Sequence, residues 1–389
     1  MKKFKLFILL FLIFITGCYN YNELNDLAIV TAIGIDKTES GYLVSIQLVN
    51  TQKTGTDTNT SGGDSKFTIY EAEGKTIEEA IKNVSYVCPK NIYLYHLGIL
   101  IFGEDTAKKG IKSTMDYIIR NIETRGDVYV FVARGKDAND IIKVITPIET
   151  LNAKNIISLL EKSSKNLGKA VLMNFRDLLN NYINSKTEIV MPSITIVERN
   201  DLGEQVENIA DSDPGTFLKI DETAIFKEDK LIGYMTNDET LGYNILKDSI
   251  NETIVNYKCK NGYVEALINN LKTDVEVNEK LEVIVNIKAS GNLSEVSCDI
   301  NIESVEKQNE IEKKIAKQLE EAVKITFNRI KDDYNSDIFG ILNMYYLNKN
   351  SFYHEIEKEW YDKHFNDLKI KVKAEVDLIG KGNTLKVIE

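Results

Sequence analysis

The pattern of apolar positions predicts that strands and helices alternate along most of the chain. Residues 28–35 are apolar on both faces of a strand, and residues 42–48 alternate apolar and polar side chains with a period of two. These patterns predict a buried strand and a half-buried strand, joined by a turn at 37–41. Thr76 and Glu79 are spaced as in a capping box, which predicts that a helix with one apolar face begins there.

A rhythm of strand and helix continues through the first half. The expected elements are a strand at 97–102, a helix at 105–122, a strand at 128–132, a helix at 137–145, a mostly helical stretch at 151–185 and a strand at 189–197. Because Pro192 interrupts the last of these, we expect an edge strand there.

The second half combines a hairpin, alternating strands and long helices. The expected elements are a hairpin at 223–235, a short helix at 239–246, strands at 281–287 and 296–302, a long helix at 304–331, a helix at 352–366 and a strand at 370–379. The long helix carries one apolar stripe, which favours packing on the protein's own sheet over a coiled-coil partner. Together these elements predict an α+β, multidomain fold with mixed and antiparallel sheets packed with helices.

Two polar stretches divide the chain. Residues 51–66 are rich in Thr, Ser and Gly and predict a mobile loop. Residues 201–215 are polar and acidic, which marks them as a linker. We therefore expect an N-terminal α+β domain at 18–200, with room for two subdomains, and a C-terminal α+β domain at 216–389.

The first residues have the features of an export signal. Three lysines precede an apolar run at 6–15, which as a helix would be about 15 Å long, half of a hydrocarbon core of roughly 30 Å. Gly17 and Cys18 follow, in the order of a bacterial lipobox, which predicts a signal peptide at 1–17 and a covalent diacylglycerol on Cys18. The alternative is an ordinary signal peptide that ends in a chance cysteine.

Composition excludes several classes of function. The chain has 389 residues and a net charge of −11, and loss of the three lysines of 1–17 makes it −14. An acidic chain is a poor ligand for nucleic acid, which binds clustered basic surfaces. With only three histidines, a histidine-rich metal site is not expected, and we predict no metal and no cofactor beyond the lipid.

The cysteines do not form a disulfide framework. Once Cys18 carries lipid, three remain, which is an odd number in a long chain. A bridge between Cys259 and Cys298 is one option, and buried or free thiols are the favoured interpretation.

A search for catalytic patterns finds no complete constellation. The sequence has no Gly-x-Ser-x-Gly elbow and no phosphate loop, and His354 has no second histidine four residues later. His96 is a candidate base, although a structural role is favoured. Three charged residues at a helix end could clamp an anion, but an ion-pair cluster or a cap of the helix is favoured: Arg120, Glu123 and Arg125. Asp337 and Phe339 lie in an expected tight turn with a buried aromatic anchor, and we expect no enzyme.

The order of several short segments resembles the Ger(x)C family, the lipoprotein C subunits of spore germinant receptors. The matching segments are Cys18 with Asn22-Glu23-Leu24, residues 27–37, His96-Leu97 with Phe102-Gly103-Glu104, Arg120-x-x-Glu123-x-Arg125, residues 224–233, Glu239-Thr240-x-Gly242-Tyr243, Asp337-Ile338-Phe339-Gly340, and Trp360 to Phe365. The chain departs from the family pattern at Tyr19, Asn121 and Ile341.

The resemblance implies a non-enzymatic subunit on the outer face of the spore inner membrane. Its partners would be a partly embedded A subunit and a polytopic B subunit, in a receptor that triggers germination in response to nutrients. We hypothesise that the chain is a scaffold or coupling component of this receptor. The residues carried as interaction or structural candidates are His96, Arg120, Glu123, Arg125, Asp337, Phe339 and Trp360.

Two other classes compete with this interpretation. A solute-binding lipoprotein would hand a small ligand to a permease and would have two similar lobes around a hinge. The two halves do not show mirrored patterns, which disfavours that class, while direct small-molecule binding stays open. A tethered hydrolase would need a nucleophile and a base that the sequence does not place.

Overall fold

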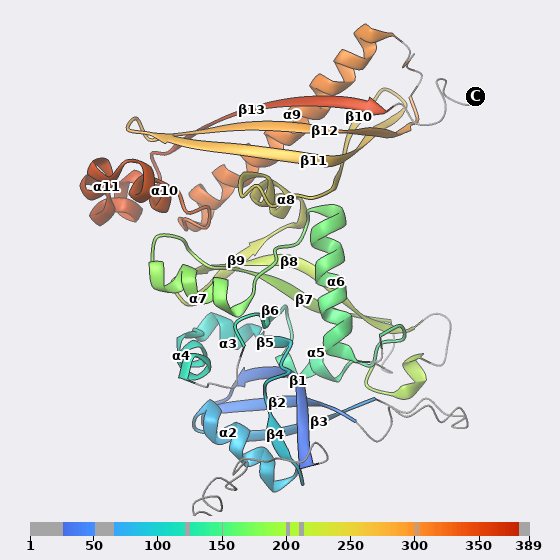
Figure 1. The fold of residues 1–389 in the computed structure, drawn as a ribbon, viewed down its shortest axis with the longest axis vertical. Coiled ribbons are helices and arrows are strands. Elements are labelled where there is room, and N and C mark those ends of the chain that lie inside the picture. Colours follow the sequence, from blue (N-terminus) through green and yellow to red (C-terminus); the bar gives the residue numbers. More distant parts are fainter. Residues whose placement is uncertain are drawn as a thin grey trace, which may run out of the picture.

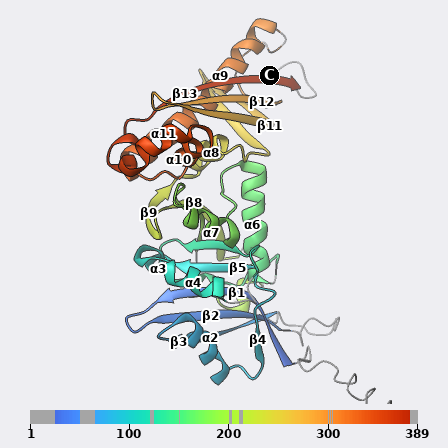
Figure 2. The same cartoon turned by 60° about the vertical axis from the view of Figure 1, so that its left-hand side comes forward.

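The computed structural model describes residues 26–50, 66–120, 125–149, 151–199, 203–209, 214–298, 300, 302 and 304–380. Over these residues the strands form two sheets, one of nine strands and one of four. Figure 1 shows the larger sheet at one end of the molecule and the smaller sheet at the other, and Figure 2 shows the same arrangement from another side. The α+β class predicted from the sequence is confirmed.

The larger sheet is mixed. Its strands follow the order β3-β2-β1-β5-β6-β7-β8-β9, with β4 beside the first residues of β1. Parallel pairs join β1, β5, β6 and β7, whereas both ends of the sheet are antiparallel. The strands are β1 (Leu27–Lys37), β2 (Tyr42–Val49), β3 (Phe67–Gly74), β4 (Asn91–Tyr93), β5 (Ile99–Gly103), β6 (Tyr129–Ala133), β7 (Val190–Glu198), β8 (Thr216–Lys227) and β9 (Lys230–Met235).

Helices cover both faces of this sheet. One apolar cluster joins α5 and α6 to one face, and a second cluster joins α2, α3, α4 and α7 to the other. All five residues of β5 are buried, as expected for a strand covered on both sides. The helices are α2 (Ile77–Asn83), α3 (Glu104–Lys109), α4 (Lys112–Arg120), α5 (Ala138–Lys143), α6 (Asn152–Leu167) and α7 (Phe175–Asn184), with short turns η3 (Val84–Tyr86) and η4 (Val206–Ile209).

Two local expectations for this half are wrong. The helix expected at 105–122 is two helices, because Gly110 adopts a φ of +113° between α3 and α4. The strand with Pro192 is not an edge strand, since β7 pairs with β6 on one side and β8 on the other. The pairing with β8 shifts register between Pro192 and Ile194, and such a bulge accommodates a residue that has no N–H to donate.

The expected linker at 201–215 does not separate the two sheets. The chain leaves the larger sheet at β7 and returns to it at β8, so that strands on both sides of this stretch are hydrogen-bonded neighbours. The change of sheet comes later, between β9 and β10. The expected loop at 51–66 lies outside the described residues except for Lys66.

The smaller sheet is covered by one long helix. Its order is β10-β11-β12-β13, with β13 parallel to β12 and the other pairs antiparallel. The buried face of α9 includes Ile311, Ile315 and Leu319, and α9 packs along β13. This confirms a helix that packs on its own sheet. The elements are β10 (Thr253–Cys259), β11 (Gly262–Asn278), β12 (Glu282–Val296), α9 (Val305–Arg329) and β13 (Lys369–Gly380).

Short helices connect the two regions. Two of them, α8 and α10, border the place where the sheets approach each other (Figure 1). The helix expected at 352–366 is a succession of shorter turns that ends at His364. These elements are α8 (Asn237–Leu246), η5 (Ile330–Tyr334), α10 (Ile341–Asn348), α11 (Asn350–Ile356), η6 (Glu357–Glu359) and η7 (Trp360–His364).

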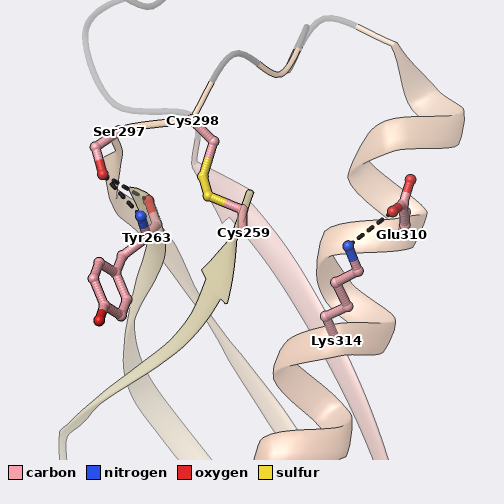
Figure 3. Close-up of a disulfide and its surroundings, with 6 residues drawn as sticks. All are labelled: Cys259, Tyr263, Ser297, Cys298, Glu310 and Lys314. Carbon is pink, nitrogen blue, oxygen red and sulfur yellow. Dashed lines mark hydrogen bonds and ion pairs between the residues drawn. A yellow bond between two sulfur atoms is a disulfide. The ribbon is translucent and has the colours of Figure 1, made fainter. Parts of the chain in front are cut away.

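A disulfide closes one end of the smaller sheet. Cys259 is the last residue of β10, Cys298 follows β12, and their Cα atoms lie 6.4 Å apart (Figure 3). This bond contradicts the favoured expectation of free thiols at these positions, whereas Cys88 is a free, buried cysteine. The strand expected at 296–302 is also wrong, because β12 already ends at Val296.

Candidate functional site

The region where the two sheets meet brings together several of the residues singled out from the sequence. We call this region the junction: Thr187, Glu188, Phe226, Lys227, Tyr243, Lys247, Phe327, Asn335 to Gly340 and Tyr361. One apolar cluster extends from the larger sheet through α8 and Phe339 to the smaller sheet. The junction is therefore built on a continuous core and not on a hinge between separate cores.

Asp337 is the buried acidic group of the junction. Its two carboxylate oxygens accept hydrogen bonds from the backbone N–H groups of Ile341 and Leu342, at 2.9 and 2.8 Å. Asp337 thereby caps the first turn of α10, which has no cap from the side chain of its own N-cap residue, Gly340. Burial raises the pKa of Asp337 to about 6, against the effect of these hydrogen bonds.

A lysine ammonium group is enclosed beside this carboxyl. Lys247 is an exposed residue, but its Nζ donates to the carbonyl oxygen of Phe339 at 3.2 Å. Desolvation lowers the pKa of Lys247, and the charge of Asp337 acts in the opposite direction. The lysine also lines a cavity of about 270 Å³ between α7 and α8.

Other junction contacts join segments that lie far apart in the sequence. Ser336 Oγ donates to the carbonyl oxygen of Phe226 at 2.8 Å, and the Glu188 N–H donates to that of Asp337 at 2.9 Å. Tyr361 donates its hydroxyl proton to Glu188 Oε1 at 2.8 Å. These bonds tie the smaller sheet's connecting segments to β8 and to the chain before β7, so the polar groups of the junction serve packing.

Aromatic rings fill the centre of the junction. Phe339 is buried, and its ring centroid lies 5.2 Å from that of Phe327 and 5.9 Å from that of Tyr243. Gly340 follows with a φ of +74°, and a Cβ there would lie 2.6 Å from Thr187 Oγ1. Only glycine fits this turn without strain.

Trp360 lies at the start of η7, next to α10. Its ring is buried against Tyr345 and Phe365, with centroid separations of 6.0 and 5.7 Å. Its Nε1 has no hydrogen-bond partner among the described atoms. The tryptophan therefore anchors the turns after α11 by apolar contact.

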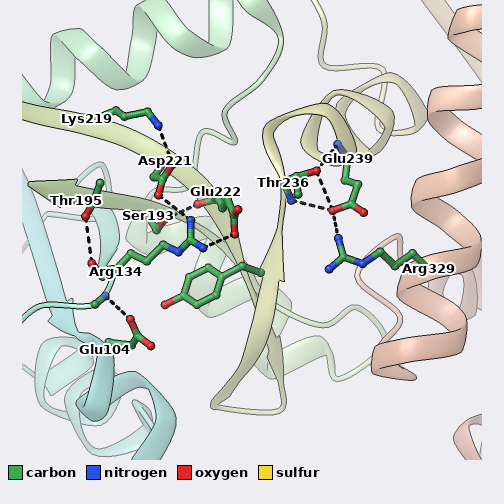
Figure 4. Close-up of polar contacts among 12 residues, drawn as sticks. Glu104, Arg134, Ser193, Thr195, Lys219, Asp221, Glu222, Thr236, Glu239 and Arg329 are labelled. Carbon is green, nitrogen blue, oxygen red and sulfur yellow. Dashed lines mark hydrogen bonds and ion pairs between the residues drawn. The ribbon is translucent and has the colours of Figure 1, made fainter. Parts of the chain in front are cut away.

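Two ion-pair clusters were missed from the sequence. Arg134 donates to Asp221 at 2.7 Å and to Glu222 at 2.8 Å, and its guanidinium lies over the ring of Tyr234 (Figure 4). Glu104 accepts a hydrogen bond from the N–H of Gly135. Arg134 and Asp221 are 87 positions apart in sequence, so no local spacing could indicate the pair.

The second cluster joins α8 to α9. Thr236 and Glu239 form a capping box at the start of α8, and Arg329 of α9 donates to the same glutamate (Figure 4). Although burial acts to raise the pKa of Glu239, the hydrogen bonds from Arg329 and Thr236 hold it below its usual value. This capping box could be recognised in the sequence, but its partner in α9 could not.

The remaining predicted residues do not converge with the junction. His96 is exposed, and its ring lies 6.0 Å from that of Tyr93. Arg120 pairs with Asp116 at 2.9 Å and Arg125 with Asp127 at 2.7 Å, each within its own segment. Glu123 lies outside the described residues, as do Cys18 and the expected signal peptide.

Arg120 also lines a second, larger cavity. This groove of about 1030 Å³ lies between α2, α4 and the start of β2, and it is lined by side chains of both charges and by two tyrosines: Tyr42, Lys75, Glu78, Lys112, Asp116, Tyr117 and Arg120. Within the described part of the chain, no group of three or more His, Cys, Asp or Glu side chains is placed to hold a metal ion. No helix in that part is long and apolar enough to span a bilayer.

Comparison with known proteins places the chain in a family. Residues 20–196 match the model described as "Spore germination protein N-terminal domain", and residues 221–382 match "Spore germination B3/ GerAC like, C-terminal". Spore germination protein KC of Bacillus subtilis (strain 168) is 26% identical over 377 residues, which is 94% of this chain and 92% of that protein. The crystal structure of the GerBC protein shares the fold, with a TM-score of 0.57 and 19% identity over 89% of this chain and 96% of that one. The chain therefore belongs to the Ger(x)C, or GerAC-like, family of spore germination proteins.

Proposed function

We propose that the chain is the C subunit of a spore nutrient-germinant receptor and acts there as a non-enzymatic scaffold or coupling component. A diacylglycerol on Cys18 would hold it on the outer face of the spore inner membrane, beside the A and B membrane subunits. Membership of the spore germination family supports the receptor assignment. The lipobox order of residues at 15–18 supports the anchor.

The observation that supports the scaffold role most is that three residues singled out from the sequence are buried and serve packing. Asp337, Phe339 and Trp360 are buried, and each fixes the packing around the junction. Side chains that hold the two sheets together suit a protein that positions its partners or transmits a signal between them. They do not suit an enzyme, which needs such groups at a substrate. An anchor would add to this by confining the scaffold to the membrane plane, which raises its effective concentration near its partners.

Fractionation of spores tests the anchor. The full chain is compared with a Cys18→Ala variant, and Cys88→Ala serves as the matched control because it removes the free, buried cysteine instead. We expect the parent chain and the control in the membrane fraction with a diacylglycerol on the N-terminal peptide. Loss of the Cys18→Ala chain from that fraction supports the proposal, and retention without lipid contradicts it.

If the protein instead binds a solute, the groove lined by Arg120 is the candidate binding site. Its cations and carboxylates, with Tyr42 at one side, could pair with both ends of an amino acid. Calorimetric titration of the full chain with amino acids and sugars tests this function. Micromolar binding that an Asp116→Ala exchange abolishes would favour it over the scaffold role, and no heat of binding would remove it.

A further inference from the structure

A set of exposed aromatic and aliphatic side chains lies within ten consecutive residues, 86–95, at one end of the molecule. Tyr86 is 88% exposed, Val87 is 56% exposed and Tyr95 is 40% exposed. The ring of Tyr95 lies tilted against that of Tyr93, the last residue of β4, with 5.0 Å between the ring centroids. We call these four side chains the basal patch.

The fold leaves the basal patch in a fixed position. Val84 is buried at the end of α2 and holds the turn that carries Tyr86, and buried Cys88 follows, with its Sγ near the carbonyl oxygen of Lys90. Tyr86 and Val87 therefore lie between two buried anchors, and Tyr95 lies between buried Leu94 and Leu97. They are presented by an ordered segment and are not tips of a long loop.

The charge around the patch differs from that of the whole protein. The chain carries 59 acidic residues, yet residues 80–103 contain none, while Lys82, Lys90 and His96 lie among them. Lys82 also pairs with Glu78, at 3.7 Å. Aromatic side chains on a segment that has lysines and no carboxylate of its own suit the headgroup region of a bilayer, where tyrosine is enriched and cationic groups are attracted by anionic lipid.

The chain enters the fold close to the basal patch, so the proposed lipid anchor lies within reach of it. Leu27, the first residue of β1, pairs with Asn91 of β4, so the chain enters the fold beside the patch. Figures 1 and 2 both place α2 and β4 at this end and the smaller sheet at the opposite end. Nine positions separate Leu27 from Cys18, which allows a tether of at most about 30 Å.

We infer that the basal patch rests on the phospholipid surface to which the protein is anchored, so that the molecule stands with its larger sheet toward the bilayer and its smaller sheet away from it. This inference rests on the proposed lipid anchor. The tether alone allows many orientations, and the exposed tyrosines, with Val87, select one of them. The smaller sheet would then face away from the lipid, open to partners.

A depth-quenching experiment tests this orientation on the full, lipidated chain. An environment-sensitive fluorophore is attached at Tyr86→Cys, in vesicles of phosphatidylcholine and phosphatidylglycerol that contain a doxyl-labelled lipid. The matched control carries the label at Val305→Cys, which is 70% exposed at the start of α9. Unsubstituted protein reports any labelling of buried Cys88.

We expect the emission at position 86 to shift to the blue and to be quenched by the doxyl lipid, with neither effect at position 305. If a diacylglycerol is present on Cys18 but position 86 is not quenched, the anchor stands and the inference is overturned. Equal quenching at both positions, or a blue shift at 86 that depends on protein concentration without vesicles, also overturns it in favour of a flat orientation or a second copy. If mass spectrometry finds no lipid on Cys18, the anchor is wrong, and failure of the chain to float with vesicles then overturns the inference as well.

Discussion

The two sheets of this protein differ in how many of their faces are covered. In the larger sheet, helices lie on both sides, and β5 is buried along its whole length. In the smaller sheet, α9 covers one face, and the other carries exposed polar side chains such as Lys272, Asp274 and Lys288. A doubly covered sheet makes a closed body, whereas a singly covered sheet presents a broad polar surface.

The difference suggests a division of labour within the proposed scaffold. The larger sheet provides the rigid base, and the smaller sheet displays charge on a face that remains accessible. The shared core at the junction means that the two regions are expected to unfold together in spite of this contrast. The following predictions test how far that coupling extends, beginning with the largest effect.

Phe339→Ala should remove the most stability, because it empties the centre of the shared core. We expect the free energy of unfolding to fall by about 3–5 kcal/mol in a urea titration followed by circular dichroism. Trp360 is the only tryptophan and reports on the smaller-sheet region, so its fluorescence should follow the same single transition. Phe352→Ala, at a half-buried ring, is the matched control with a smaller expected loss. Separate transitions by the two probes would show that the regions are independent.

Removal of the disulfide should act mainly on the smaller sheet. The bridge joins residues 39 positions apart, and its loss in a Cys259→Ser, Cys298→Ser double variant should cost about 2–4 kcal/mol. Thermal unfolding with and without reductant measures the effect. Cys88→Ser should leave the sensitivity to reductant intact. A parent chain that melts at the same temperature in both conditions would contradict the prediction.

Two buried carboxyls should give stability the same pH dependence in both regions. Asp36 accepts from the N–H groups at the start of α5, as Asp337 does at the start of α10, and burial raises the pKa of each to about 6. Between the unfolded pKa near 3.9 and this value, the folded chain keeps a proton that the unfolded chain has lost. Stability therefore falls as the pH rises through this window, by about 3 kcal/mol for each group.

The matched variants separate the two contributions. Asp36→Asn and Asp337→Asn should each remove about half of the change in unfolding free energy between pH 4 and pH 6.5, measured by urea titration. Asp238→Asn, at an exposed carboxyl, should leave it unchanged. If both Asn variants show the same change over this window as the parent chain, the two carboxyls are already ionised in the folded protein and the assignment fails.

The smallest expected effects contrast a half-buried arginine with an exposed one. Arg329→Ala leaves Glu239 without its partner between α8 and α9 and should cost about 1–3 kcal/mol. Arg120→Ala removes a fully exposed pair and should leave the free energy of unfolding nearly unchanged. Differential scanning calorimetry of the two variants measures the contrast. Equal losses would mean that the contact between α8 and α9 does not help to couple the regions.

Periodicity was a good guide where a single element decides the structure. The continuous run at 97–102 and the apolar stripe of the long helix correspond to β5 and α9. The turn at Asp337 was also recognised, because the conformation of a four-residue turn depends mainly on the residues within it. The sequence therefore predicted the element types well and the α+β class correctly.

What the sequence could not predict depends on contacts between distant segments. The disulfide requires the ends of β10 and β12 to be neighbours, and the Arg134 cluster requires β6 to lie near β8. Pro192 suggested an edge because the bulge that accommodates it forms only against β8. The roles of His96 and of Arg120 as functional residues stay predictions, since exposure alone does not identify a partner.

Crosslinking in intact spores tests the central claim most directly. The full chain, tagged at its C-terminus, is crosslinked before lysis, and the captured proteins are identified by mass spectrometry, with the Cys18→Ala chain as the control. We expect two membrane proteins to be enriched, one of them polytopic, and both to be lost or strongly reduced in the control. Capture of soluble proteins alone, or unchanged capture by the chain without its anchor, would contradict the proposal that this protein is a membrane-anchored receptor subunit.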